Sequence, residues 1–232
     1  MVASTEGAPG SAGMNGQRPA VLIMARAPRA GEVRRALEPV LGREGCVELQ
    51  SALIAQAAEW AREVGSGPPH VAHDPPDAGA ELRRLVGADA VVFPQNGEGI
   101  AGRLADASAR VLARSGGPLL IVWPDLPRLR AEHAAAALGD LAAGCDVVLG
   151  PAIDGGLYLV GIARPLPELF ALPEQAWRHD VMGVALTAIR DVGFEVGILR
   201  AERALHRPAD VRAALADPLL PGDVAAILRR RI

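Results

Sequence analysis

The sequence predicts an α/β fold, a single domain with a mostly parallel, Rossmann-like sheet flanked by helices. Short continuous apolar runs alternate with segments of helical periodicity, and no internal linker divides the chain. Unbroken apolar runs are typical of central parallel strands, which are buried on both faces. A chain of 232 residues is long enough to bury one such sheet between two layers of helices.

The expected elements follow one another regularly along the chain. Strands are predicted at 20–25, 70–73, 90–93, 118–123, 146–149, 158–162 and 194–199. Helices are predicted at 44–64, 80–86, 100–113, 130–143, 181–192, 208–216 and 223–230. A short connection before 158–162 suggests a hairpin-like or edge arrangement for that strand. Residues 1–19, rich in Gly, Ser, Ala and Pro, are expected to be a disordered leader, and 20–232 to form the domain.

Composition narrows the functional classes. With 24 basic and 27 acidic side chains the net charge is −3, and no concentrated basic patch indicates a nucleic-acid or membrane partner. No apolar run approaches the ~20 residues of a membrane span, so we expect a cytoplasmic protein. Every basic residue is Arg, which excludes a lysine nucleophile or Schiff base. Cys46 and Cys145 lack metal-ligand spacing and are expected to be reduced.

Two acidic residues follow the ends of predicted strands. The apolar run 118–123 leads into Asp125, and the run 147–149 leads through a short loop into Asp154. Because ligands bind at the carboxyl edge of open α/β sheets, these two acids are predicted to mark the active site. Asp125 suits a Mg²⁺ or Mn²⁺ ligand that also contacts a diphosphate, and the alternative is a helix N-cap.

Around Asp154 the sequence offers further candidates for substrate binding. Gly155 and Gly156 would allow the loop to approach a sugar or phosphate closely, although they also suit an ordinary tight turn. Asp154 itself could orient or deprotonate an acceptor hydroxyl. Tyr158 is predicted either to line the same pocket or to pack in the core. Trp177 could stack on a base or sugar, or anchor a loop by packing.

Arginines provide the candidate phosphate ligands. Arg26 and Arg34 flank Gly31 where the first strand opens into a turn, and Arg103 stands near the start of a helix after a Gly-rich loop. Guanidinium forks and helix N-termini both bind phosphate, and Gly31 permits close backbone approach. The alternative for these arginines is a solvated surface. His206, just before a late helix, is either a structural side chain or a metal ligand.

Three motifs carry a resemblance to a known family. The pattern Arg-Ala-Pro-x-x-Gly-x-x-Lys-Thr-Arg-Leu corresponds to residues 26–37, and Gly-Ser-Asp-Cys-Pro-x-Leu corresponds to 123–129. A third, Leu-Gly-Pro-Ala-x-Asp-Gly-Gly-Tyr-Tyr-Leu-Ile-Gly, is nearly intact at 149–161. On these motifs the chain resembles, over about residues 20–215, the glycosyltransferase-A-fold proteins called radical-SAM/selenodomain-associated transferase 1. The resemblance implies a nucleotide-diphospho-sugar transferase fold, related to sugar and molybdopterin nucleotidyltransferases.

The chain departs from the family pattern at several positions. Arg34 replaces the motif's Lys, Ala36 replaces its Arg, and Gly99 replaces the Asp of a Gln-x-Gly-x-Asp segment. His206 stands in the late Asp-Val-Asp-Thr-Pro motif, where related folds use an acid to hold a metal. An imidazole could still bind Mn²⁺, whereas Mg²⁺ prefers oxygen ligands.

These observations predict a transferase that uses Mg²⁺ or Mn²⁺ and moves a glycosyl group from a nucleotide-diphosphate sugar to a small acceptor. Asp125, with His206, would hold the metal, Asp154 would act on the acceptor hydroxyl, and arginines would steady the leaving group. One alternative is nucleotidylyl transfer from a nucleoside triphosphate. The other is a catalytically weakened nucleotide-binding protein of the same fold. The sequence leaves the oligomeric state open.

Overall fold

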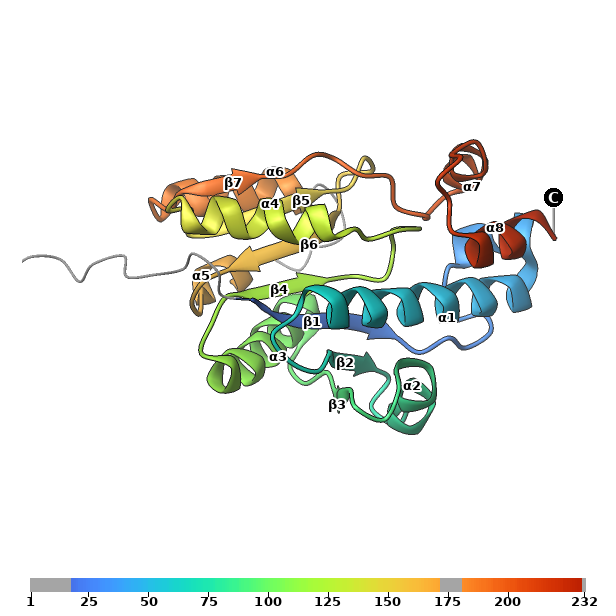
Figure 1. The fold of residues 1–232 in the computed structure, drawn as a ribbon, viewed down its shortest axis with the longest axis horizontal. Helices are drawn as coiled ribbons and strands as arrows, with labels where there is room; N and C mark the ends of the chain where they lie inside the picture. Colours follow the sequence, from blue (N-terminus) through green and yellow to red (C-terminus); the bar gives the residue numbers. More distant parts are fainter. Residues whose placement is uncertain (1–17, 172–180, 231–232) are drawn as a thin grey trace, which may run out of the picture.

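The computed structural model describes residues 18–171 and 181–230. Its sheet has seven strands in the order β3-β2-β1-β4-β6-β5-β7 (Figure 1). The strands are β1 (Ala20–Arg26), β2 (His70–Asp74), β3 (Val91–Pro94), β4 (Leu119–Val122), β5 (Val147–Pro151), β6 (Leu157–Ile162) and β7 (Val196–Ile198). Only β6 runs against its neighbours, so the predicted mostly parallel α/β sheet is confirmed for the described residues.

Strand β6 differs in part from its prediction. It pairs antiparallel with β5, as a hairpin-like arrangement requires, but it also pairs with β4 and therefore lies inside the sheet. The alternative of an edge position is wrong, because both flanks of β6 are hydrogen-bonded and its last five residues are buried. This strand places the parallel strands β4 and β5 on either side of it.

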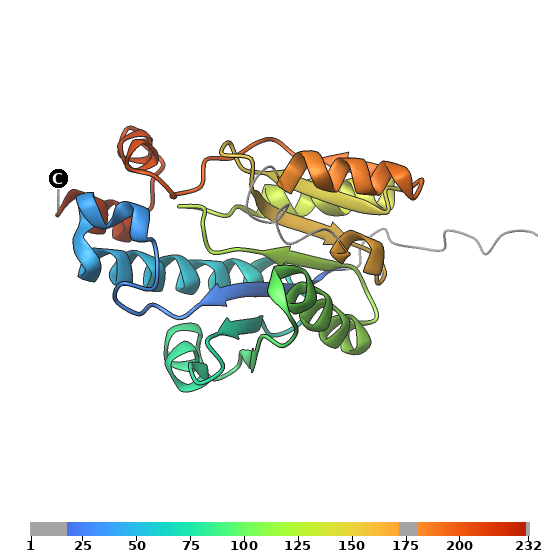
Figure 2. The same cartoon turned by 180° about the vertical axis from the view of Figure 1, so that it is seen from behind.

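Helices cover both faces of the sheet. On one face lie α1 (Glu38–Val64), α2 (Gly79–Val86) and α4 (Ala131–Ala142), which share an apolar cluster with the sheet (Figure 1). The opposite face carries α3 (Gly99–Ser115), α5 (Pro167–Phe170) and α6 (Val181–Asp191), seen in Figure 2. The core is built mainly from Val, Leu, Ile and Ala side chains.

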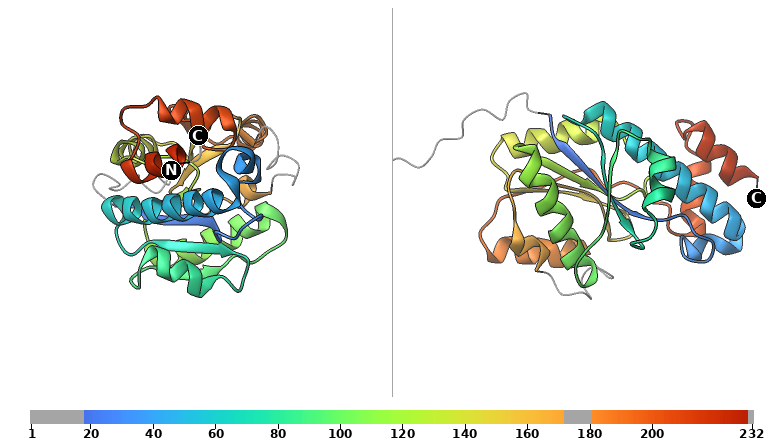
Figure 3. Two further views of the ribbon diagram at one scale, coloured as in Figure 1. Left: turned by 90° about the vertical axis from the view of Figure 1, so that its right-hand side faces the viewer. Right: turned by 90° about the horizontal axis from the view of Figure 1, so that it is seen from below.

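A third apolar cluster lies beyond the carboxyl end of β1. There the 3₁₀ turn η1 (Arg35–Leu37) and the start of α1 pack against α7 (Pro208–Leu215) and α8 (Gly222–Arg229), as Figure 3 shows. The helix α5 is an addition to the predicted elements. Helix α1 also begins earlier than predicted, because Gly42, with a φ of 68°, joins two helical segments across a kink. Among the described residues, no helix combines the length and apolarity that crossing a bilayer demands.

The topology gathers the ends of several strands at one edge. Strands β1 and β2 end at Arg26 and Asp74, and β4 and β5 end just before Asp125 and Asp154. All four strands run in the same direction, so their carboxyl ends meet where an open α/β sheet binds ligands.

Candidate active site

Asp125 and Asp154 meet at a single histidine. The Nε2 atom of His206 lies 3.4 Å from Asp125 Oδ2, and its Nδ1 forms a short hydrogen bond with Asp154 Oδ2. The prediction that the two acids come together is therefore confirmed, with His206 between them. A neutral imidazole has one N–H, so contact with carboxylates through both nitrogens favours the doubly protonated ring.

The surroundings of His206 support its positive charge. The hydrogen bond with Asp125 is the largest cause that raises the pKa of His206, to about 9, with Asp154 adding to it against burial. Burial alone would raise the pKa of Asp125, but His206 and Arg34 outweigh it and leave that pKa below its ordinary value. For Asp154, burial is likewise outweighed by His206, and the pKa is lowered. The three groups thus form a carboxylate–imidazolium–carboxylate cluster.

Short loops fix the two carboxylates. The Asp125 N–H donates to the Trp123 carbonyl at 2.8 Å, and the Asp125 carbonyl accepts from the N–H of Leu205 at 2.9 Å. The second bond ties the loop after β4 to the segment that carries His206. Asp154 Oδ1 accepts from the Gly156 N–H at 3.2 Å.

Asp210 holds the backbone at His206. Its carboxylate, only 8% exposed, accepts the N–H of Arg207 at 2.8 Å and the N–H of His206 at 3.3 Å. Asp210 is the third residue of α7, a position from which an acidic side chain reaches back to the N–H groups just before the helix. The pattern Pro208-Ala209-Asp210, with Pro at the first helical position, was the sequence signal for this cap.

Arg34 is a buried part of the scaffold. Its guanidinium donates to the Pro124 carbonyl at 2.6 Å, the Leu205 carbonyl at 2.9 Å and Asp125 Oδ1 at 3.2 Å, and its side chain is 4% exposed. Burial lowers the pKa of Arg34, while the Asp125 charge opposes this. These bonds join the loops that deliver Asp125 and His206. Arg34 also lines the larger cavity of the site, and its contact with a phosphate stays a prediction.

Beside this cluster lies a cleft made of two adjoining cavities of about 320 and 200 Å³, whose linings share Met24, Arg26 and Trp123. The larger cavity reaches Asp125 and His206, and the smaller reaches Arg103.

Asp74 holds two of the arginines that line the cleft. Arg26 Nη2 and Arg103 Nη1 lie 3.0 and 3.3 Å from the same oxygen, Asp74 Oδ2. One carboxylate thus faces two guanidinium groups, and this part of the cleft keeps a positive charge that suits a phosphate. The predicted pairing of Arg26 with Arg103 at one site is consistent with this geometry.

Other predicted site residues lie elsewhere. Tyr158 is fully buried, donates to the Arg200 carbonyl at 3.2 Å and packs edge-on against His133, so the core-packing alternative holds and the pocket-lining one is wrong. Gly31 adopts a φ of 76° in its turn and lines neither cavity. Gly155, with a φ of 93°, and Gly156 shape the loop of Asp154. Trp177 lies outside the described residues.

The sequence did not single out two further cleft residues. Asp74 ends β2 in the same way that Asp125 follows β4, and the same argument about strand ends would have found it. Trp123 lines both cavities, directly after β4. Its signal was a large aromatic side chain at the carboxyl end of a buried strand, in a chain with only 3% aromatic residues.

A Mg²⁺ or Mn²⁺ ion needs several converging donor atoms that are free to bind it. The nearest donors are the two carboxylates and His206, and both imidazole nitrogens already contact those carboxylates. Within the described parts of the chain, no three His, Cys, Asp or Glu side chains converge on a point that could hold a metal. As arranged, these residues do not fit the ion, because the imidazole stands between the carboxylates that would bind it. Metal binding by Asp125 and His206 stays a prediction.

Comparisons with known proteins agree with this architecture. Residues 57–174, just over half of the chain, match the family DUF2064, described as uncharacterized proteins conserved in bacteria. The chain belongs to this family. The matched segment of the DUF2064 protein contains Arg103, Asp125 and Asp154. No curated protein matches the chain.

Solved structures show the same fold. A candidate nucleotide-diphospho-sugar transferase from Desulfovibrio desulfuricans G20 has a TM-score of 0.80 and 22% identity, over 90% of this chain and 93% of that one. The inositol-1-phosphate CTP transferase from T. maritima has a TM-score of 0.53 and 14% identity, over 92% and 96%. CMP:2-keto-3-deoxy-manno-octonic acid synthetase, complexed with CTP, has a TM-score of 0.53 and 14% identity, over 93% and 100%. The DUF2064 protein therefore has the nucleotide-diphospho-sugar transferase fold.

Proposed function

We propose that this DUF2064 protein is a transferase that moves a glycosyl group from a nucleotide-diphosphate sugar to the hydroxyl of a small acceptor. The observation that supports this most strongly is the Asp125–His206–Asp154 cluster, at the carboxyl edge of the sheet and beside an arginine-lined cleft. A cation-rich cleft at this edge suits a diphosphate, and the two carboxylates suit a hydroxyl.

In the proposed complex the diphosphate lies against Arg26 and Arg103. Both guanidinium groups are partly exposed, and Asp74 holds them in one place, which reduces the entropy lost when a phosphate binds. Trp123, on the wall that both cavities share, offers an aromatic face to the nucleotide. Arg34 acts indirectly by holding Asp125.

His206 and Asp154 face the reacting groups in this proposal. As the bond between the sugar and the diphosphate breaks, negative charge grows on the leaving group, and the imidazolium of His206 can stabilise it. The acceptor oxygen forms the new bond to the sugar carbon, and the proton of its hydroxyl, which is hydrogen-bonded to Asp154, passes to that carboxylate and from there to solvent. Because its pKa is lowered, Asp154 is a weak base whose main contribution is to orient that hydroxyl.

Nucleotidylyl transfer is the second candidate. Two structures with this fold are, by their descriptions, a CTP transferase and a synthetase complexed with CTP, and the same cleft could hold a triphosphate. In that reaction an acceptor phosphate would attack the α-phosphorus and release diphosphate. Arg26 and Arg103 would then hold the departing diphosphate.

Product analysis separates these reactions. The purified protein is incubated with a panel of nucleotide-diphosphate sugars and nucleoside triphosphates and with sugar or sugar-phosphate acceptors, with Mn²⁺ or with EDTA. Release of nucleoside diphosphate supports glycosyl transfer, and release of inorganic diphosphate supports the second candidate. Binding without either product indicates a nucleotide-binding protein and refutes both reactions.

A pair of variants connects any activity to the site. Asp154→Asn is expected to lower kcat about 10²-fold or more, which is the lower end of the contribution that general acid–base catalysis makes. Asp191→Asn, at the exposed end of α6, makes the same chemical change and should leave kcat unaltered. Equal activity in both variants would exclude Asp154 from the reaction.

A further inference from the structure

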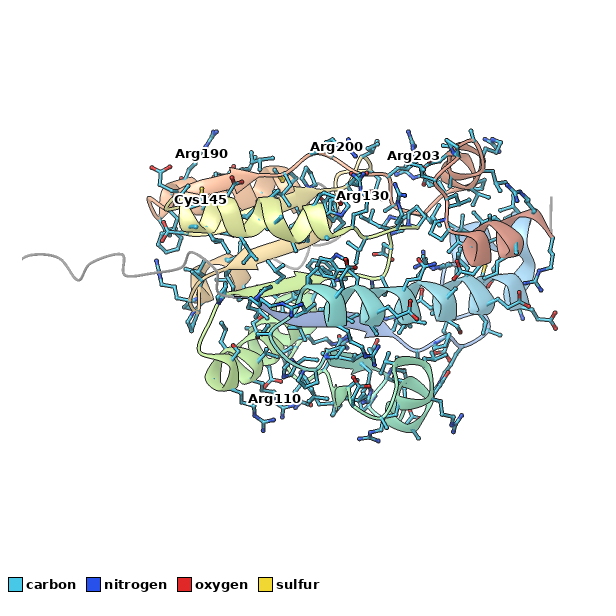
Figure 4. All side chains as sticks on the ribbon, in the orientation of Figure 1. Arg110, Arg130, Cys145, Arg190, Arg200 and Arg203 are labelled. Atoms are coloured by element: carbon cyan, nitrogen blue, oxygen red, sulfur yellow. The ribbon has the colours of Figure 1, made fainter. Side chains whose placement is uncertain are left out.

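A second cavity of about 430 Å³ lies outside the cleft, and the two linings share no residue. It is formed by the loop after β4, the segment after β7, and α7 with the residues that follow it. Figure 4 shows three of its arginines, Arg130, Arg200 and Arg203, gathered beside α4 and α7, whereas Arg110 lies on α3 at the far side of the sheet. Nothing in the proposed reaction uses this cavity.

Its lining carries an excess of positive charge. Four arginines, Arg128, Arg130, Arg200 and Arg203, face two acids, Glu202 and Asp217. One oxygen, Glu202 Oε1, already accepts Arg200 at 2.7 Å, His133 at 3.2 Å and Arg130 at 3.4 Å. Glu202 is therefore shared between two cations, Arg200 and Arg130, and cannot neutralise the lining.

The two remaining arginines are the ones best placed for a ligand. Within the described part of the chain Arg128 takes part in no salt bridge, although it is half-buried and lines two cavities. Arg203 contacts Asp210 at 2.9 Å through Nη1, and its side chain is 43% exposed. Both guanidinium groups keep N–H donors for an added anion.

We propose that this cavity, the arginine pocket, binds the phosphate group of a small phosphorylated molecule. Guanidinium groups match the geometry of phosphate oxygens, and the volume is that of a small-molecule site. A neighbouring cavity of about 440 Å³ also touches Arg128 but is lined by Glu59, Glu63 and Asp223. That acidic lining repels an anion, so the phosphate is directed to the arginine side.

The arginine pocket and the cleft are lined by neighbouring residues of the same two chain segments. Leu126 lines the pocket one residue after Asp125, and Arg203 lines it three residues before His206. The bond from the Leu205 N–H to the Asp125 carbonyl joins the two segments. A bound phosphate would therefore contact the same two segments that deliver the catalytic cluster.

Calorimetric titration with inorganic phosphate and with ribose 5-phosphate, in a phosphate-free buffer of low ionic strength, tests the proposal. The Arg128→Gln/Arg203→Gln double variant is expected to bind both probes at least tenfold more weakly. An independent variant, Ala213→Glu, places a carboxylate in the pocket at an exposed position of α7 that favours helix formers. It should cause a similar loss, and circular dichroism checks that it folds.

Two controls locate the binding. The Arg84→Gln/Arg190→Gln variant removes the same charge from exposed positions elsewhere and should stay within twofold of the natural protein. Arg103→Gln, in the cleft, should also keep the pocket's binding. The proposal is overturned if neither probe binds, if both double variants weaken binding equally, or if only Arg103→Gln abolishes it. Because this test does not depend on turnover, it remains decisive even if no transferase activity is found.

Discussion

The charge of His206 makes stability depend on pH. Its pKa rises from 6.5 in an unstructured chain to about 9 in the folded protein, since Asp125 and Asp154 stabilise the protonated ring. A group whose pKa is raised on folding contributes fully below its unfolded pKa, and that contribution disappears as the pH rises through the folded value. The stabilisation should therefore be complete below pH 6.5 and lost by about pH 9.

The difference between the two pKa values sets an upper limit of about 3 kcal/mol on this contribution. The His206 side chain is 39% exposed, so solvent screening reduces the expected value to about 1–2 kcal/mol.

Urea unfolding at pH 6 and at pH 9.5 measures the change. A His206→Gln variant is measured in parallel, and subtracting its change in the free energy of unfolding cancels the contribution of the other titrating groups. The natural protein should lose about 1–2 kcal/mol more than the variant between these pH values. Equal losses in both proteins, or an NMR titration that gives His206 a pKa near 6.5, would refute the bridging arrangement.

Three further predictions concern the scaffold and the ion. Arg34→Met should lower the free energy of unfolding by about 2–4 kcal/mol, because it leaves a partly buried carboxylate and two carbonyls without their donor; a loss below 0.5 kcal/mol in urea titration would contradict this. Gly150→Ala should lower the free energy of unfolding by about 1–3 kcal/mol, since the added Cβ would lie 2.7 Å from the ring of the buried Tyr158. Gly139→Ala places its Cβ in open space beside the helix α4 and should instead raise the melting temperature. A higher melting temperature for Gly150→Ala than for Gly139→Ala would refute the packing described around Tyr158. In calorimetry His206→Asp should bind Mn²⁺ at least tenfold more tightly than the natural protein; tighter binding by the natural protein would show that the imidazole is a ligand.

The fold was predictable because local signals agreed with the tertiary structure. The buried strands β1 and β4 are unbroken apolar runs, and the helical periodicity of α3 places its apolar side chains against the sheet. What periodicity could not give was strand order. The insertion of β6 between β4 and β5 depends on pairing along both flanks, which is a property of the whole sheet.

The site was predictable only where a residue's place in the chain fixed its place in space. Asp125 and Asp154 follow strand ends, so their meeting at one edge followed from topology. The role of Arg34 did not, because its guanidinium reaches carbonyls far along the sequence. The late motif marked His206 as a site residue, but its position between two acids depends on the loop that Asp210 holds.

The most direct test of the account is whether a nucleoside diphosphate binds beside Asp74 and Trp123. Titration of uridine, guanosine, adenosine and cytidine diphosphates is followed by tryptophan fluorescence, with Trp123→Phe to assign the signal. We predict that at least one nucleotide changes the fluorescence, that Trp123→Phe abolishes the change, and that Arg103→Gln weakens binding at least tenfold while Arg84→Gln does not. Binding of none of the four, or binding unaffected by Arg103→Gln, would contradict the proposed nucleotide cleft.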